Sequence, residues 1–169
     1  TVSINLSEAL AQMETVLLID ADMRRPSIGK SLGLPRNSPG LSNLVAGTAS
    51  ANQCIHKIEG TSVSVMPAGV IPANPLELLS SKRFEAALQK LSHHFDRIIL
   101  DSAPTHSVSD ALVLSTHANA VIYVVKSDST SSQLAAKGIR RLRDVDAPVV
   151  GVVLNQVDLD KASSYGSYY

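Results

Sequence analysis

The feature that most constrains this chain is the stretch VLLIDAD at residues 16–22. Four apolar residues run directly into Asp20 and Asp22, and such a run is typical of a strand buried on both faces of a parallel sheet. The acids then lie at the carboxyl end of the strand, where open α/β sheets bind their ligands. Two carboxylates one residue apart can hold a metal ion, orient a water molecule or accept a proton. The alternative is an acidic surface turn without a chemical role.

Composition favours one aliphatic α/β domain. The chain has 169 residues and is 44% hydrophobic, with two Phe and no Trp. Its 15 basic and 15 acidic residues cancel, so overall charge gives no case for a nucleic-acid partner. Cys54 is the only cysteine, which excludes an internal disulfide and fits a reducing compartment. We find neither a signal peptide nor an apolar run near the ~20 residues needed to span a membrane.

Strand and helix patterns alternate along the chain, which predicts βαβ units in a mostly parallel sheet with helices on both faces. We expect no internal repeat and no second domain. Besides the first strand, strands are predicted at 63–66, 97–100, 120–125 and 149–154. Helices are predicted at 1–13, 41–45, 50–55, 75–91 with a break near 80–81, 109–114 and 133–145, with an irregular segment containing a helical turn at 27–34.

Three predicted strands end in polar residues that we expect at one edge of the sheet. The first ends in Asp20 and Asp22, the third in Asp101 and the fifth in Asn155. Two acidic strand ends close together indicate a hard cation, and carboxylates suit Mg²⁺ better than zinc. An apolar run followed by Asp, as at 97–101, is also the Walker B pattern of nucleotide hydrolases. Magnesium held by few carboxylates usually accompanies a phosphate substrate.

The only Gly-Lys-Ser of the chain, at Gly29, Lys30 and Ser31, is not interpreted as a phosphate-binding loop. Such a loop needs a further glycine five residues before its last one, and Arg24 occupies that position. It also needs a strand in front and a helix behind, and Pro26 intervenes.

Several segments together resemble the bacterial tyrosine kinases. VLLIDADMRRP at 16–26 resembles their Walker A-prime motif, and FDRIILDSAP at 95–104 resembles their Walker B motif. GLSNLVAG at 40–47, NPLELLSS at 74–81, DALVL at 110–114 and the tail YGSYY at 165–169 are also similar to family segments. The acidic motifs are shared with MinD- and ParA-like ATPases, whereas Arg24-Arg25-Pro26, NPLELL and the tyrosine tail single out the kinases.

The resemblance implies a P-loop NTPase-like fold of the MinD/ParA type and an ATP- and Mg²⁺-dependent protein-tyrosine autokinase. Family members serve capsule or exopolysaccharide polymerisation and export, as cytoplasmic domains at the bacterial inner membrane. They phosphorylate their own tail tyrosines in trans, and often other proteins. The implied partners are further copies of the chain in a ring and a membrane-embedded co-polymerase or activator domain, with a tyrosine phosphatase as a further candidate.

The chain departs from the family at its start, because there Thr1 would directly follow the Gly-Lys-Ser/Thr of the P-loop. The first strand and the P-loop would precede Thr1, and without them we expect this fragment to bind ATP poorly and to be inactive. The predicted organisation is therefore a truncated P-loop-type kinase domain at 1–162 and a flexible, tyrosine-rich tail at 163–169.

The resemblance assigns a role to each candidate residue. Asp20 would accept the tyrosine hydroxyl proton or hold Mg²⁺ through water, Asp22 would support that geometry, and Asp101 would hold Mg²⁺. Thr1 would lie near the α-phosphate. Asn155 matches a position that reads adenine, or it satisfies its own turn. Arg24 contacts phosphate or pairs with a neighbouring acid, and Arg25 is structural or lies at a subunit contact.

The tail residues Tyr165, Tyr168 and Tyr169 are the predicted phosphoacceptors, because a polar tail of this kind is typically mobile enough to reach another subunit. The alternative is an inert tail. Arg140, Arg141 and Arg143 form a basic helix face that we interpret as solvated, and the five histidines show no ligand spacing.

Two other functions remain open from the sequence. One is a MinD- or ParA-like partitioning or positioning ATPase, which would make no phosphoprotein; the tyrosine tail and the lack of an amphipathic C-terminal membrane helix argue against it. The other is a scaffold domain without catalysis, against which the intact acidic motifs argue.

Overall fold

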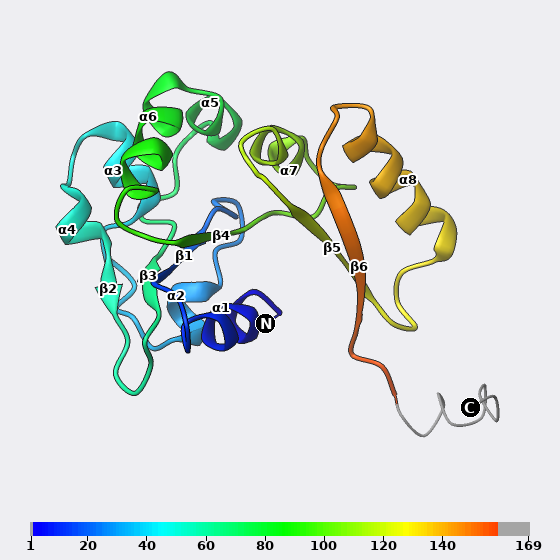
Figure 1. Ribbon diagram of the computed structural model, residues 1–169. Helices are drawn as coiled ribbons and strands as arrows, with labels where there is room; N and C mark the ends of the chain where they lie inside the picture. Colours follow the sequence, from blue (N-terminus) through cyan, green and yellow to red (C-terminus); the bar gives the residue numbers. More distant parts are fainter. Residues whose placement is uncertain (1, 159–169) are drawn as a thin grey trace. The chain divides into compact units, whose positions relative to one another are not determined.

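The computed structural model describes residues 2–158 and divides the chain into two compact units, with the boundary between Leu114 and Ser115 (Figure 1). The first unit contains a four-stranded sheet, and the second contains a two-stranded sheet.

The sheet of the first unit has the strand order β2-β3-β1-β4. Its strands are β1 (Val16–Asp20), β2 (His56–Lys57), β3 (Ser64–Met66) and β4 (Arg97–Asp101). Strand β1 pairs in parallel with β3 on one side and with β4 on the other, whereas β2 is antiparallel to β3. All five residues of β1 are buried, as the apolar run predicts for a central strand.

Alternating side chains of β1 point into two apolar clusters, so helices cover both faces of this sheet. Leu17 and Ile19 belong to one cluster, and Leu18 belongs to the other. The first cluster contains residues from α3 (Leu41–Ala46), α4 (Ala51–Cys54), α5 (Pro75–Leu79), α6 (Lys82–Leu91) and α7 (Asp110–Ser115). The second contains residues from α1 (Val2–Leu10) and α2 (Ile28–Ser31).

The second unit pairs β5 (Val121–Lys126) in parallel with β6 (Val149–Asn155), and α8 (Ser132–Arg143) connects the two strands. Tyr123, Val125 and Leu142 are its buried large side chains, whereas most of β6 is exposed. The last turn of α8 carries Arg140, Arg141 and Arg143, the basic face predicted from the sequence.

The mostly parallel α/β fold and its helices on both faces are confirmed, with one correction to the sheet. The sequence predicts one edge for the ends of the first, third and fifth strands. In the structure β4 ends the first sheet, and β5 pairs only with β6 among residues 2–158. The reason is that no described strand hydrogen-bonds to the outer edge of β4 or of β5. The boundary predicted between residues 162 and 163 lies outside the described residues.

Local signals also hold in detail. The predicted helix break is present, since α5 ends at Leu79 and α6 begins at Lys82. Asn74 caps α5 by accepting a hydrogen bond from the Glu77 amide, 3.3 Å long. No helix within residues 2–158 combines the length and the apolar character needed to cross a membrane.

Candidate functional site at the carboxyl ends of two parallel strands

The two acidic strand ends predicted from the sequence meet side by side. Strands β1 and β4 pair in register from Val16 opposite Arg97 to Asp20 opposite Asp101. The chain then continues on the β1 side, where the Ala21 amide donates a 2.8 Å hydrogen bond to the Asp101 carbonyl. Asp20 and Asp101 therefore lie at one edge of the sheet, as parallel pairing requires.

Asp20 is fully buried, and its two carboxylate oxygens have different surroundings. Oδ2 accepts hydrogen bonds from the amides of Ser27 and Ile28, each 2.9 Å long. Oδ1 is buried without a hydrogen-bond partner. Since a buried polar atom without a partner is costly, an oxygen kept in this state is typical of a site that receives a ligand or a proton.

Burial raises the pKa of Asp20 to about 6, because the charged form loses its contact with water. The two amide donors act in the opposite direction, and the negative charges of Asp101 and Asp22 raise the pKa further. A carboxylate in this state remains mostly ionised at pH 7 and is a stronger base than an ordinary aspartate.

Asp22 organises the turn that follows β1. Its Oδ1 accepts hydrogen bonds from the amides of Arg24 and Arg25, 3.1 and 3.0 Å long, so the side chain closes the turn onto its own backbone. Asp22 is half-buried and lies close enough to Asp20 and Asp101 to raise the pKa of both. Its predicted role as a companion to Asp20 stays a prediction.

Asp101 is half-buried at the end of β4. Burial raises its pKa, a hydrogen bond from the Ser3 side chain lowers it, and the charge of Asp22 raises it. Ser3 belongs to α1, so the first helix of the described chain reaches the same site. The three carboxylates thus influence one another electrostatically at one edge of the sheet.

Arg24 forms an ion pair with Asp110, which is the alternative that the sequence analysis left open for this residue. Its Nε lies 2.8 Å from Asp110 Oδ2, and its Nη2 lies 3.0 Å from Asp110 Oδ1. The Arg24 side chain is 41% exposed, whereas that of Asp110 is fully buried. The pair raises the pKa of Arg24, mainly through the side-chain hydrogen bond. The predicted phosphate contact of Arg24 remains a prediction.

The other predicted residues lie in the second unit, in the helix α2 or outside the described part. Asn155 ends β6 in the second unit, where its carbonyl accepts a 2.9 Å hydrogen bond from the Ser127 amide; its adenine contact stays a prediction. Gly29, Lys30 and Ser31 lie in the four-residue helix α2, and the interpretation that they form no phosphate-binding loop stays a prediction. The residues outside the described part are Thr1, Tyr165, Tyr168 and Tyr169.

The carboxylates fit a magnesium ion of the kind that proteins hold with few ligands. Among residues 2–158, no three His, Cys, Asp or Glu side chains gather into a metal-binding group. Mg²⁺ is usually held by one or two carboxylates together with water and substrate phosphates, so a set of three protein ligands is not required. The free Oδ1 of Asp20 and the half-buried Asp101 supply oxygen ligands of the right kind.

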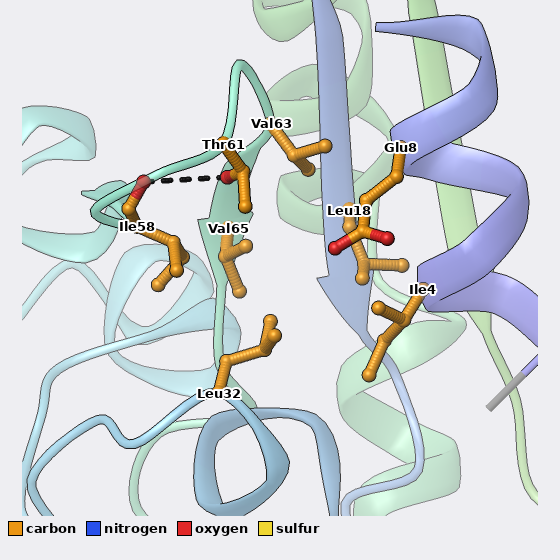
Figure 2. A pocket seen from close by; sticks show the side chains of 8 residues that line it. All are labelled: Ile4, Glu8, Leu18, Leu32, Ile58, Thr61, Val63 and Val65. Carbon is orange, nitrogen blue, oxygen red and sulfur yellow. Dashed lines mark hydrogen bonds between the residues drawn. The ribbon is translucent and has the colours of Figure 1, made fainter.

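A small hollow elsewhere in the first unit does not compete with this site. Figure 2 shows it between α1, β1 and β3. Its lining is mostly aliphatic and consists of Ile4, Glu8, Leu18, Leu32, Ile58, Thr61, Val63 and Val65. The Thr61 hydroxyl is already used, since it donates a 3.3 Å hydrogen bond to the Ile58 carbonyl (Figure 2). A hollow with one carboxylate and no second free polar group offers no chemistry comparable to that of the three aspartates.

The sequence patterns missed two contributors to the site. Asp110 lies in a predicted helix and in a segment similar to the family, and nothing in the sequence pairs it with Arg24, which lies 86 positions away. Ser3 carries no motif, and only its placement on the helix before β1 brings it to Asp101. For Asp110, an acid at the start of a helix after the second acidic strand is the one signal available.

Comparisons with known proteins identify relatives of this chain. The AAA domain family matches residues 1–149. The putative tyrosine-protein kinase CapB of Staphylococcus aureus is 33% identical over 99% of this chain and 73% of its own length. The tyrosine-protein kinase ptk of Acinetobacter johnsonii is 34% identical over 95% of this chain, which is only 22% of that longer relative.

Solved structures extend the comparison to the fold. The VpsO kinase domain superposes with a TM-score of 0.89 at 36% identity, covering 92% of this chain and 77% of that domain. The cell division ATPase MinD of Pyrococcus furiosus, at 23% identity and a TM-score of 0.73, shares the fold. So does a cobyrinic acid a,c-diamide synthase of Mycobacterium smegmatis with bound ATP analog and magnesium, at 19% identity and a TM-score of 0.77.

Proposed function

The chain belongs to the bacterial tyrosine kinases, and we propose that the protein containing it transfers the γ-phosphoryl group of ATP to tyrosine hydroxyls. The proposed acceptors are Tyr165, Tyr168 and Tyr169, offered by one copy of the chain to the site of another. The products are phosphotyrosine and ADP. The proposal builds on the family, on the acidic strand ends and on the tyrosines at the end of the sequence.

The observation that carries the proposal is the free, buried Oδ1 of Asp20. A tyrosine hydroxyl has a pKa near 10, so its attack on phosphorus is helped by a base that takes the proton as the oxygen–phosphorus bond forms. Asp20 Oδ1 accepts no hydrogen bond in the described structure, and the pKa of Asp20 is about 6. The proton moves from the tyrosine oxygen to Asp20, while the bond between the γ-phosphorus and the ADP oxygen breaks.

Asp22 and Asp101 support this step in different ways. Asp22 holds the turn after β1 in shape and adds negative charge that keeps Asp20 basic. Asp101 is the proposed protein ligand of Mg²⁺, which when bound would neutralise charge on the ATP phosphates, while Oδ1 of Asp20 stays open to the tyrosine hydroxyl. Phosphoryl transfer depends mainly on positioning and on charge neutralisation, so the residues are proposed to orient the reactants rather than to form covalent intermediates.

The wider setting is proposed from the family. The relatives include chains of which this stretch is about three quarters and chains of which it is about a fifth. We place this domain at the cytoplasmic face of the inner membrane, in a ring of copies bound to a membrane-embedded co-polymerase or activator domain. Its proposed role there is to regulate capsule or exopolysaccharide polymerisation and export, with a tyrosine phosphatase reversing the modification.

A phosphotyrosine assay on the full-length natural protein tests the proposal. With labelled ATP and Mg²⁺, the protein should label its own tyrosines, and replacing Tyr165, Tyr168 and Tyr169 with Phe should remove most of the label. Mixing this triple variant with a catalytically dead copy that keeps its tyrosines should restore labelling, on the dead copy, if transfer occurs in trans. Hydrolysis of ATP without any phosphotyrosine would contradict the proposal and favour a MinD-like ATPase.

A further inference from the structure

The ion pair between Arg24 and Asp110 joins the two loops that follow the acidic strands. Arg24 lies in the turn after β1, and Asp110 begins α7, at the end of the loop that follows β4. Both oxygens of the Asp110 carboxylate receive a guanidinium nitrogen, at 2.8 and 3.0 Å. Such a two-point contact fixes the direction of both side chains, which a single contact would not do.

The burial of Asp110 makes this contact more than a surface ion pair. Its side chain is 0% exposed, so the carboxylate has lost its water and depends on protein partners. Arg24 keeps part of its side chain in solvent. Loss of the contact therefore affects the two charges differently. The buried Asp110 carboxylate would be left without compensation, whereas the Arg24 guanidinium could still be solvated.

Local hydrogen bonds shape the turn after β1 but do not orient it relative to the second loop. Asp22 closes the turn onto the amides of Arg24 and Arg25, which are contacts within the turn itself. The Ala21 amide ties the start of the turn to the Asp101 carbonyl. Met23 is fully buried, but a flexible apolar side chain specifies direction poorly.

We propose that Asp110 is a positioning residue that, through Arg24, holds the turn that follows Asp20 and carries Asp22 at a fixed place relative to Asp101. This inference rests on the proposed function, since it concerns the same three carboxylates. Catalytic groups need a geometry held within a fraction of an ångström, and a displacement of about 1 Å can cost 10²-fold in rate. The Ala21 contact and the Arg24 pair give the turn two anchors to the β4 side, one at its start and one within it.

The competing role for Arg24 is the predicted phosphate contact, and the two roles differ in their kinetics. A phosphate ligand contributes to binding ATP, so its loss raises the KM for ATP. A positioning pair contributes to the rate of the chemical step, so its loss lowers kcat with little change in KM. Asp110, as a buried acid, has no reason to bind phosphate itself. The two residues should therefore behave alike only if they act as a pair.

The test is a double-mutant cycle in the full-length protein, measuring kcat and the KM for ATP in phosphotyrosine formation. Asp110→Asn and Arg24→Gln are each expected to lower kcat by about 10- to 100-fold, with the KM for ATP within about threefold of the original value. The double variant should be no slower than the slower single variant, since one contact can be lost only once. Arg24→Lys, which keeps the charge but not the two-point geometry, should recover part of the rate.

Glu14→Gln is the matched control. Arg97 contacts Glu14 with the same two-point geometry, at 2.8 and 3.0 Å, but at the amino ends of β1 and β4. Its kcat should remain within about twofold of the original value. Thermal unfolding and circular dichroism of every variant, with rates taken at a temperature where each is folded, remove the effect of stability alone.

Two results would overturn the inference. One is an Asp110→Asn variant with unchanged kcat. The other is an Arg24→Gln variant with a raised KM for ATP and losses that add in the double variant, which would assign Arg24 to phosphate. Failure of the proposed function is seen separately, because it appears in the original protein as ATP hydrolysis without phosphotyrosine. The same cycle is then scored on the rate of hydrolysis.

Discussion

At the amino ends of β1 and β4, Arg97 pairs with Glu14, and at the carboxyl ends Arg24 pairs with Asp110. Each end also has an aspartate whose Oδ2 accepts two hydrogen bonds. Asp96 receives the amide and the hydroxyl of Thr15 at 2.9 and 2.6 Å, and Asp20 receives two amides at 2.9 Å. The same kinds of contact are therefore present at both ends of the same two strands.

The two ends differ in how deeply their aspartates are buried. Asp96 is exposed, and its hydrogen bonds with Thr15 lower its pKa, so its charge is stabilised as in an ordinary structural contact. Asp20 is fully buried with one free oxygen, and its pKa is raised to about 6. The comparison teaches that the contact type does not identify a site. A site is marked by a charge that the fold keeps buried and leaves partly unsatisfied.

The largest expected difference between the ends is in catalysis. Asp20→Asn keeps the side-chain shape and an oxygen for the two amides but removes the base, so phosphotyrosine formation should fall by about 10³-fold. Asp96→Asn, the matched change at the amino end, should leave the rate within about twofold. Labelling of the full-length protein from ATP measures both. Equal losses in the two variants would contradict a catalytic role that belongs to the carboxyl end alone.

Removing either partner of the ion pair at the carboxyl end should lower the unfolding free energy, and by different amounts. Arg24→Gln leaves the buried Asp110 carboxylate without compensation, which for a buried charge costs about 3 kcal/mol of unfolding free energy. Asp110→Asn should cost less, because the freed Arg24 side chain can turn into solvent. Urea unfolding measures the order of the two variants. Equal costs, or the reverse order, would show that Asp110 does not depend on Arg24.

Lowering the pH should change the contributions of the two ends to the unfolding free energy in opposite directions. The pKa of Asp20 is about 6 when folded and near 3.9 when unfolded, so the folded state binds the proton more tightly. Ionised Asp20 therefore costs up to about 3 kcal/mol above pH 6, and the cost disappears as the pH falls towards 4. Glu14 and Asp96 have lowered pKa values, so their contribution is present above pH 4 and is lost as acid protonates them.

Measuring the unfolding free energy of Asp20→Asn and of the original protein between pH 4 and 7.5 tests these opposite pH dependences. The variant should be more stable than the original protein above pH 6, with an advantage that shrinks as the pH falls. Asp96→Asn should show the reverse, being less stable at neutral pH and equal to the original at low pH. A stability difference for Asp20→Asn that does not change with pH would contradict the raised pKa.

The smallest expected effect belongs to the exposed ion pair at the amino end. Glu14 is 30% and Arg97 53% exposed in their side chains, so solvent and salt screen their attraction. Glu14→Gln should lower Tm by less than about 2 °C, and less at high salt. A differential scanning calorimetry series in salt measures it. A larger shift that does not depend on salt would mean that the amino end is more than a surface contact.

The sequence predicted much of the fold because its signals are local. The apolar run before Asp20 marked the central strand, and Ser80 and Ser81 marked a helix break. Strand β2, with only His56 and Lys57, was not predicted because two residues carry no periodicity. The division into two sheets was missed because sheet pairing is decided between distant segments.

The sequence predicted the acidic residues of the site but not the contacts that they make. Asp20 and Asp101 follow from strand patterns, since parallel pairing brings their ends together. The Arg24 partner could not be chosen, because Asp110 is distant in sequence and its burial depends on the packed structure. The free oxygen of Asp20 is likewise a property of packing, which no motif states.

The pH dependence of tyrosine phosphorylation tests the account most directly. At saturating ATP and Mg²⁺, with nucleotide occupancy checked at each pH, the rate in the full-length protein should fall on the acid side with an apparent pKa near 6, that of Asp20. Asp96→Asn should keep this profile. A rate that stays level from pH 7 down to pH 5, or the same profile in Asp20→Asn, would contradict the assignment of Asp20 as the base.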